Sequence, residues 1–199
     1  MSADGWVLTL TQAHREQPRA PRLSKDALTG LPDRSALRER LATHLGQGGL
    51  SVARPIGLLC IDLDRFKAIN DTMGHPAGDA VLCEAADRLR RMVRRTDLVA
   101  RLGGDEFAVA LPETPPAEAI ARIEDLCQAI GGSPIEIEQV AVTMTCSAGI
   151  AAMPADGSST SILVAAADRR LLAAKRQGRN RVVSESPQGA RLVRPSLAR

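Results

Sequence analysis

Aromatic side chains are nearly absent from this sequence, which has one Trp, two Phe and no Tyr among 199 residues. A hydrophobic core must therefore be built from Leu, Ile, Val and Ala, and the 44% hydrophobic content is ordinary for a globular protein. Proteins that bind single-stranded nucleic acid usually stack the bases on aromatic rings. With so few rings and a net charge of only +3, the chain is not expected to bind nucleic acid.

Long apolar runs and paired cysteines are missing as well. No stretch approaches the roughly 18 consecutive apolar residues of a membrane helix, and no secretory signal heads the chain. We therefore expect no membrane segment and a cytoplasmic location. The cysteines stand far apart and form no CxxC pair, which favours reduced thiols over disulfides; they are Cys60, Cys83, Cys127 and Cys146.

The length fits one domain with tails. Residues 1–22 combine a short β-like piece, GWVLTLT, with a polar stretch that holds two prolines. We interpret them either as the remnant of an upstream sensor module or as a simple leader. Residues 184–199 have no periodic apolar face and are interpreted as a tail or linker. The domain itself is expected over residues 23–183.

Hydrophobic periodicity predicts alternating helices and strands between these ends. The first half should hold a helix starting at Asp33, a strand over 55–64, two helices of which the longer covers 77–95, and a hairpin joined by Gly103 and Gly104. The second half should hold a helix over 116–130, a strand region over 139–153, a helix over 161–177 and a closing strand. This order predicts an α+β fold, with helices packed on a mostly antiparallel sheet.

Two acidic pairs stand at the ends of predicted strands. Asp62 and Asp64 close the apolar strand over 55–64, and residues two apart in a strand start on the same face. Asp105 and Glu106 follow the hairpin glycines. One pair alone is also typical of a turn cap or a solvated strand end. Two pairs without nearby histidine or thiolate favour Mg²⁺ or Mn²⁺ over zinc, and leave coordination positions for a nucleotide triphosphate.

The glycines before the second acidic pair suit a close approach of ligand to backbone. Gly103 and Gly104 can both adopt positive φ, which is typical of a hairpin turn. A turn without Cβ atoms also lets a phosphate or ribose come near, with backbone N–H groups facing the anion. A Gly-Gly turn is common, but the adjacent acids make this one a candidate site.

Two further pairs have chemistry that suits a guanine nucleotide. Asn70 and Asp79 offer an amide that donates and accepts, and a carboxylate that accepts from N1–H and the exocyclic amine of guanine. Both residue types also cap helices well. Lys175 and Arg179 are four residues apart at the end of the last helix, where they can reach phosphates or complement the helix dipole. From the residues alone, both interpretations stay open for each pair.

Together these residues resemble the GGDEF family, the diguanylate cyclases of bacterial signalling. The resemblance covers roughly residues 23–183 and rests on five motifs in order, which are DALTGLPDR (26–34), DLDRFKAINDTMGHPAGD (62–79), RLGGDEF (101–107), SAGIA (147–151) and AAKRQGRNRV (173–182). It implies a fold similar to the palm of nucleotidyl cyclases and polymerases, with a ferredoxin-like βαββαβ core around a central antiparallel sheet.

The resemblance also implies a reaction, in which two GTP molecules condense into cyclic di-GMP and release two pyrophosphates. Two Mg²⁺ or Mn²⁺ ions per active site are implied, bound by Asp62, Asp105 and the main-chain carbonyl of Leu63. Asp105 is the implied acceptor of the 3′-hydroxyl proton, and Glu106 belongs to the same catalytic and metal-binding acidic cluster. Each subunit would hold one GTP, so closing the ring implies a homodimer with facing active sites.

Substrate contacts are implied at the remaining motif positions. Asn70 and Asp79 would bind guanine with His75 nearby, and Gly103 and Gly104 would admit the nucleotide over the hairpin. The implied phosphate contacts are the main-chain N–H groups around Phe66, together with Lys175 and Arg179.

An RxxD motif, formed by Arg94 and Asp97, ends shortly before the hairpin. In the family a motif at this spacing forms an inhibitory product site, so we expect cyclic di-GMP to act as a feedback inhibitor. Leu102 and Leu172 stand where the family often has aromatic residues, but both keep their positions apolar. These departures should affect packing and leave the chemistry intact.

An alternative function is a regulatory module that binds GTP or cyclic di-GMP without making product. Degenerate members of the family usually lose an acid or a glycine from the hairpin, and here Gly103, Gly104, Asp105 and Glu106 are all present. This favours the enzyme. A palm acting on another nucleotide agrees less well with the guanine-binding pair Asn70 and Asp79.

Overall fold

The structure is a computed structural model that describes residues 23–46 and 55–184. The leader predicted for residues 1–22, and the tail predicted for 184–199 beyond its first residue, lie outside the described residues. No helix within the described part of the chain has the length and apolar character needed to cross a membrane.

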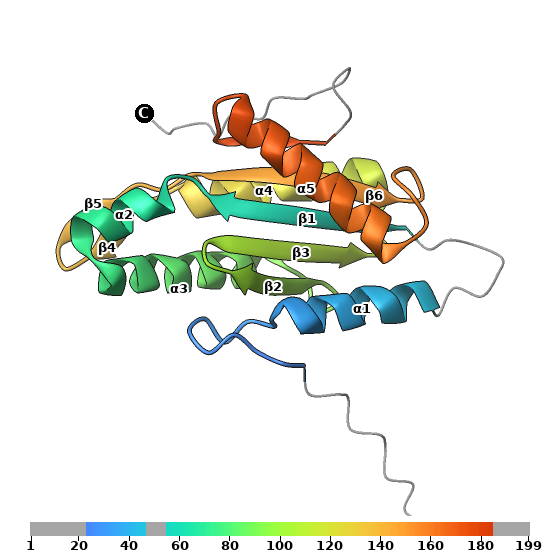
Figure 1. Cartoon of the computed structure of the whole chain (residues 1–199), viewed down its shortest axis with the longest axis horizontal. Helices are drawn as coiled ribbons and strands as arrows, with labels where there is room; N and C mark the ends of the chain where they lie inside the picture. The colour runs from blue at the N-terminus through green and yellow to red at the C-terminus, as the bar shows by residue number, and fades with distance from the viewer. Residues whose placement is uncertain (1–22, 47–54, 185–199) are drawn as a thin grey trace, which may run out of the picture.

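A five-stranded sheet forms the centre of the molecule (Figure 1). Its strands are β1 (Ile56–Leu63), β2 (Leu98–Gly103), β3 (Glu106–Pro112), β6 (Cys146–Met153) and β7 (Arg181–Val183), in the spatial order β2-β3-β1-β6-β7. β1 lies between β3 and β6, antiparallel to both, and all eight of its residues are buried. This confirms the strand that the continuous apolar run predicts.

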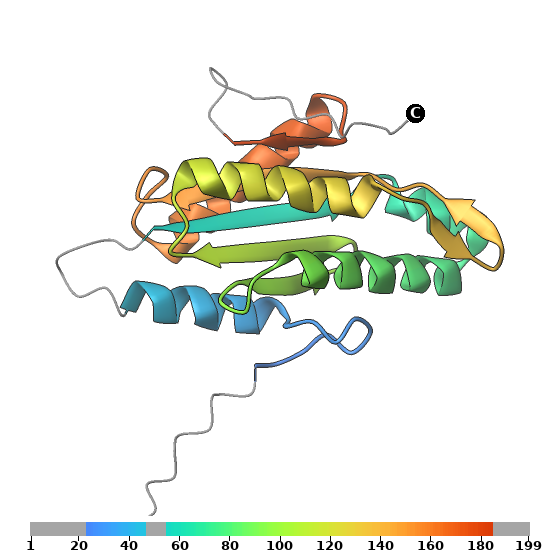
Figure 2. The same cartoon turned by 180° about the vertical axis from the view of Figure 1, so that it is seen from behind.

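Helices cover both faces of the sheet. They are α1 (Arg34–Gly46), α2 (Phe66–Met73), α3 (His75–Met92), α4 (Pro116–Gly131) and α5 (Thr160–Arg176). α1 and α5 lie in front of the sheet in Figure 1, and α3 and α4 lie in front when the molecule is seen from behind in Figure 2. Two apolar clusters fill the two spaces, built almost wholly from aliphatic side chains.

The alternation of side chains along β1 assigns each residue to one of these layers. Leu59 and Ile61 pack with α3 and α4, whereas Leu58 and Cys60 pack with α1 and α5. Since side chains alternate along a strand, Asp62 continues the second series. The last acidic residue of β1 therefore faces the layer that holds α1 and α5.

The topology confirms the predicted α+β palm. The chain order β1, α2 and α3, β2, β3, α4, β6, with β1 between β3 and β6, is the ferredoxin-like βαββαβ arrangement. One pair of strands, β6 with β7, is parallel, so the sheet is mixed at one edge.

Three local features differ from the sequence-based expectation. Arg179, expected with Lys175 at the end of the last helix, lies beyond α5, which ends at Arg176. The predicted strand region over 139–153 is two strands: β5 (Val140–Val142) pairs with β4 (Ile135–Ile137) in a separate hairpin, and only β6 joins the main sheet. In the β2–β3 hairpin, Gly103 pairs with Glu106, so the turn residues are Gly104 and Asp105. Both glycines have positive φ, of 135° and 52°, as expected.

Candidate active site

The acidic residues converge at one end of the two central strands. Asp62 of β1 stands directly opposite Glu106 of β3, and directly opposed residues in an antiparallel pair point to the same face. Asp105 lies in the adjoining turn, and its carbonyl accepts a hydrogen bond from the amide of Leu63 at 3.2 Å. The turn is thereby tied to the end of β1, which brings three carboxylates to one place.

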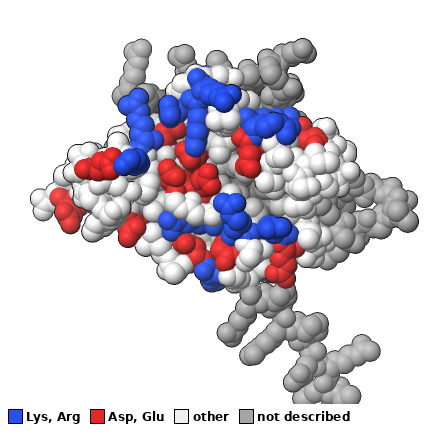
Figure 3. All heavy atoms as spheres, in the orientation of Figure 1, with Lys and Arg blue, Asp and Glu red and all other residues white. Residues whose placement is uncertain are grey.

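Basic side chains from two helices flank these carboxylates. Lys175, near the end of α5, donates from Nζ to Asp62 Oδ2 at 2.5 Å. Arg34, at the start of α1, donates to the carbonyl of Leu102 and lies 3.7 Å from Glu106 Oε2. Figure 3 shows the result, a central acidic patch with basic groups above and below it. The carboxylates therefore lie between Lys175 on one side and Arg34 on the other.

The electrostatics of Asp62 suit a bound cation. Burial raises the pKa of Asp62, the hydrogen bond from Lys175 lowers it, and the charges of Asp105 and Glu106 raise it again; the net pKa shift is upward. No group of three or more His, Cys, Asp and Glu side chains in the described residues could hold a metal alone. Mg²⁺ commonly uses only one or two carboxylates and completes its shell with phosphates and water, so the donor set fits a metal that arrives with a nucleotide.

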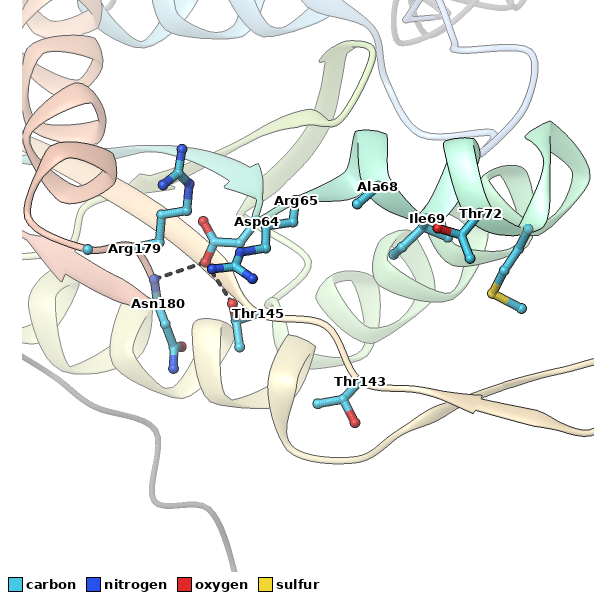
Figure 4. A pocket seen from close by; sticks show the side chains of 11 residues that line it. Asp64, Arg65, Ala68, Ile69, Thr72, Thr143, Thr145, Arg179 and Asn180 are labelled. Atoms are coloured by element: carbon cyan, nitrogen blue, oxygen red, sulfur yellow. Dashed lines mark hydrogen bonds between the residues drawn. The ribbon is translucent and has the colours of Figure 1, made fainter.

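Asp64, the other acid of the first predicted pair, has a different place. It lies beyond the end of β1 and accepts hydrogen bonds from Thr145 Oγ1 at 2.7 Å and from the amide of Asn180 at 2.9 Å (Figure 4). Ser147 Oγ also donates to it, at 2.6 Å. These bonds connect the end of β1 with β6 and the segment before β7. Its buried carboxylate is satisfied by protein donors, which indicates a structural role.

A cavity of about 660 Å³ lies beside Asp64, between α2 and the segment before β7. Arg65 and Arg179 line it, and both have left-handed backbone, with φ of 59° and 63° (Figure 4). The first turn of α2, which begins at Phe66, has no side-chain cap. Uncapped N–H groups and two guanidinium groups are donors that suit phosphate.

The guanine-binding candidates lie where α2 meets α3. Asn70 is half-buried on α2, and Asp79 and His75 are exposed on α3. The Oδ1 atom of Asn70 is buried and has no hydrogen-bond partner among the described residues. A Cβ atom at Gly78 would collide with this Oδ1 and would lie 2.9 Å from its Cγ and 3.1 Å from Phe66 Cζ. Gly78 therefore makes the space in which the Asn70 amide sits.

The resemblance assigns Asn70 to guanine, so we expect Gly78→Ala to raise the KM for GTP by roughly tenfold, because losing one buried hydrogen bond to a ligand costs about 1–2 kcal/mol. The added methyl must displace Asn70 while improving the helix propensity of α3. Steady-state kinetics and thermal unfolding of Gly78→Ala, Asn70→Ala and the double variant check this. If the two KM effects simply multiply, Gly78 does not act through Asn70.

Several residues that support the site were not assigned from the sequence. Arg101 donates to the carbonyl of Gly104 from Nε at 3.0 Å and Nη2 at 2.8 Å, and from Nη1 to both carboxylate oxygens of Asp26. Asp33 caps α1, and hydrogen bonds from the Ser24 and Ser35 hydroxyls hold its pKa at about 2. The segment before α1 is thus connected to the β2–β3 hairpin.

The RxxD residues lie apart from the acidic patch and make internal contacts. Asp97 accepts from the amide of Arg94 at 2.7 Å and from Arg122 Nη2 at 2.5 Å, and its side chain is 1% exposed. The guanidinium of Arg94 is 63% exposed and lies 3.2 Å from Glu118. The guanidinium of Arg94 is therefore accessible to a ligand, whereas the carboxylate of Asp97 is hydrogen-bonded within its own turn and to α4.

Comparison with known proteins identifies the family. The family model described as "Diguanylate cyclase, GGDEF domain" matches residues 23–181. The chain belongs to the GGDEF family. This confirms the resemblance seen in the five motifs, and the acids, glycines and cations described above all lie inside the matched region.

Two proteins of Pseudomonas aeruginosa are among the relatives that this chain is similar to. The bifunctional diguanylate cyclase/cyclic di-GMP phosphodiesterase MucR is 42% identical over 155 residues, 78% of this chain and 22% of MucR. The diguanylate cyclase DgcP is 40% identical over 174 residues, 85% of this chain and 25% of DgcP. The chain thus spans about a quarter of these relatives. The solved GGDEF domain of TpbB (YfiN) superposes with a TM-score of 0.76 at 40% identity, covering 82% of this chain and 95% of that one.

Proposed function

We propose that the chain is a diguanylate cyclase, which condenses two GTP molecules into cyclic di-GMP and two pyrophosphates. The observation that carries the proposal is the direct pairing of Asp62 with Glu106 beside Asp105, between Lys175 and Arg34. Three carboxylates between two cationic side chains suit phosphoryl transfer, in which cations stabilise the negative charge that develops on phosphate oxygens. The names and similarity of the relatives support the same activity.

Each subunit would bind one GTP across α2 and the end of β1. Asn70 and Asp79 bind the guanine edge, with His75 at the rim and Gly78 giving the amide its space. The N–H groups around Phe66, together with Lys175 and Arg179, bind the triphosphate. Gly103 and Gly104 leave the hairpin open, since nothing within 4 Å would meet a Cβ atom at either position.

Asp62, Asp105, Glu106 and the carbonyl of Leu63 would hold two Mg²⁺ or Mn²⁺ ions together with the phosphates. Bound there, the ions would lower the pKa of the 3′-hydroxyl and neutralise charge on the α-phosphate and pyrophosphate. Lys175 would then exchange its contact with Asp62 for one with phosphate. Asp105 would accept the 3′-hydroxyl proton.

Product formation would require two subunits. One GTP supplies the 3′-hydroxyl that attacks the α-phosphate of the other. The second bond forms by the same reaction with the roles of the two nucleotides exchanged, so the two sites must face each other. The GGDEF domain alone would then be active only as a homodimer, at concentrations where two copies meet.

Incubation of the protein with GTP and Mg²⁺ at low and high protein concentration tests the proposal, with the products identified by mass. Cyclic di-GMP that rises more than linearly with protein supports a cyclase limited by dimer encounter. GTP binding without product at any concentration would favour the alternative, a regulatory module that binds GTP or cyclic di-GMP.

Feedback inhibition by cyclic di-GMP is proposed at the RxxD motif, with Arg94 binding the product and Asp97 holding the turn. Arg94→Ala should raise the concentration of cyclic di-GMP needed for half-inhibition by roughly tenfold, since a charge-assisted contact contributes about 1.5–3 kcal/mol. Inhibition curves for Arg94→Ala and for Arg95→Ala, an exposed neighbour, check this. Equal curves for the two variants would remove Arg94 from the product site.

A further inference from the structure

A second hollow lies on the other side of the catalytic hairpin. It has a volume of about 610 Å³ and is lined by the segment before α1, the start of α1 and the end of β2. Its charged lining consists of three arginines, Arg34, Arg38 and Arg101, and two carboxylates, Asp26 and Asp33, and Gly103 lies at its edge. Gly103 also borders the acidic patch through its pairing with Glu106. The hollow therefore adjoins the acidic patch from the side opposite Lys175.

Only part of the positive charge in this hollow is used within the protein. Arg101 is committed to Asp26 and to the carbonyl of Gly104, and its side chain is 11% exposed. Arg38 is exposed and makes no hydrogen bond or ion pair with another described residue. Arg34 is 62% exposed, and its ion pair with Glu106 is long, at 3.7 Å. Arg34 and Arg38 thus have guanidinium N–H groups that can bind an external anion.

The subunit's own nucleotide leaves this hollow free. Its guanine is assigned to α2 and α3, and its phosphates to the start of α2 and to α5, all on the far side of the acidic patch from α1. A phosphate that reaches Arg34 and Arg38 therefore has to come from another molecule. In the proposed reaction the second GTP, carried by the facing subunit, brings its α-phosphate to this point.

We propose that Arg34 and Arg38 bind the α-phosphate of the GTP held by the facing subunit. This inference rests on the proposed function and assigns a site in trans to it. Guanidinium groups bind phosphate oxygens with parallel hydrogen bonds and keep their charge at any physiological pH. The arginines orient the phosphate for attack and stabilise its added charge.

Arg34 and Arg38 assist the attack of the 3′-hydroxyl on the α-phosphate. The 3′-hydroxyl of a subunit's own GTP gives its proton to Asp105, and its oxygen forms a bond to the α-phosphorus of the partner-held GTP. The bond from that phosphorus to the bridging oxygen breaks, and pyrophosphate leaves with the electron pair. Arg34 and Arg38 therefore act in the subunit that supplies the attacking hydroxyl, on a nucleotide that the other subunit binds.

Mixed dimers test this division of roles. A dimer with one intact Asp105 can form only one of the two bonds, so it yields the linear dinucleotide pppGpG. In the first mixture, Arg34→Ala/Arg38→Ala chains are mixed with a large excess of Asp105→Asn chains, so that nearly all of them are in mixed dimers. In the second, wild-type chains meet the same excess of Arg34→Ala/Arg38→Ala/Asp105→Asn chains. Both mixed dimers carry the same substitutions, distributed differently between the subunits.

We expect the first mixture to form pppGpG roughly 10- to 100-fold more slowly than wild-type chains mixed with Asp105→Asn chains, whereas the second should match that reference. Arg91→Ala/Arg95→Ala chains, which lose two exposed arginines elsewhere, serve as the control for charge. GTP binding to the Arg34→Ala/Arg38→Ala chain should stay within about twofold of wild type, which shows that its fold and its own guanine site are intact.

Three outcomes would overturn the inference. The first is that pppGpG forms at equal rates in both mixtures and in the reference. The second is that only the second mixture is slowed, which would mean that the arginines bind their own subunit's nucleotide. The third is that both mixtures are slowed equally. Failure of the proposed function is recognised separately, because wild-type protein alone would then make no cyclic di-GMP.

Discussion

Asp105→Asn should lower the rate of cyclic di-GMP formation by at least about 10³-fold while GTP binding persists. The change removes one carboxylate from the acidic patch and the proposed acceptor of the 3′-hydroxyl proton, and general-base catalysis alone contributes about 10²–10⁴-fold. Asn keeps the size of the side chain. The turn also keeps its main-chain bond from Leu63 to the carbonyl of residue 105. The loss should therefore fall on kcat rather than on folding.

Asp125→Asn is the matched control, because Asp125 is exposed on α4, on the opposite face of the sheet. Its activity should equal that of the unchanged protein. Turnover by mass-identified product, GTP affinity in Ca²⁺ and thermal unfolding are measured for both variants. If Asp105→Asn kept more than about a tenth of the activity, Asp105 could not be the proton acceptor.

The acidic patch was predictable because its members lie in short runs of sequence. Asp62 ends an apolar strand, and Asp105 and Glu106 follow two glycines, so each group could be placed at a strand end by local pattern. The pairing register of β1 with β3 then brings them together. Asp64 shows the limit of such patterns. The same spacing that suggests a shared face with Asp62 could not reveal that donors from residues 145, 147 and 180 already satisfy its carboxylate.

The supporting contacts were not predictable because they join residues far apart in sequence. Arg101 contacts Asp26 across 75 positions, and Arg34 contacts the carbonyl of Leu102 across 68. DALTGLPDR was recognisable as a motif, but no periodicity assigns a partner to its charged residues. The role of Gly78 likewise depends on the close approach of α2 to α3, which only the folded chain shows.

The α+β order of elements followed from the change of apolar period along the chain, and most helices begin within a few residues of their expected start. The β4–β5 hairpin was missed because its strands have three residues each and continue into the next apolar run. A three-residue strand gives too few positions for alternation to be recognised. Thr143 and Thr145, in the connection to β6, mark the break, and both line the cavity beside α2.

Gly149→Ala should lower the free energy of unfolding by about 3 kcal/mol, the upper end of the cost of overpacking. A Cβ atom at residue 149 of β6 would collide with the Ala167 carbonyl oxygen and the Leu171 amide, and would lie 2.8 Å from the carbonyl carbon of Arg170. These are backbone atoms of α5, so no rotamer change can relieve the contact. We expect Tm to fall by roughly 6–12 °C.

Gly149 also fixes the height of α5 above the sheet, and α5 carries Lys175 to Asp62. Molecules of Gly149→Ala that remain folded should therefore bind GTP more weakly, because the lifted helix withdraws Lys175 from the site. Gly30→Ala is the control. Gly30 has φ of 64°, but a Cβ atom there would meet no heavy atom within 4 Å. The change should therefore lower the free energy of unfolding by only roughly 1–2 kcal/mol, the cost of left-handed backbone for a residue with a Cβ atom. Equal Tm values for the two variants would show that α5 does not rest on Gly149. A larger loss at residue 149, with weaker GTP binding, would show that packing of one glycine against a helix positions Lys175, the proposed phosphate contact.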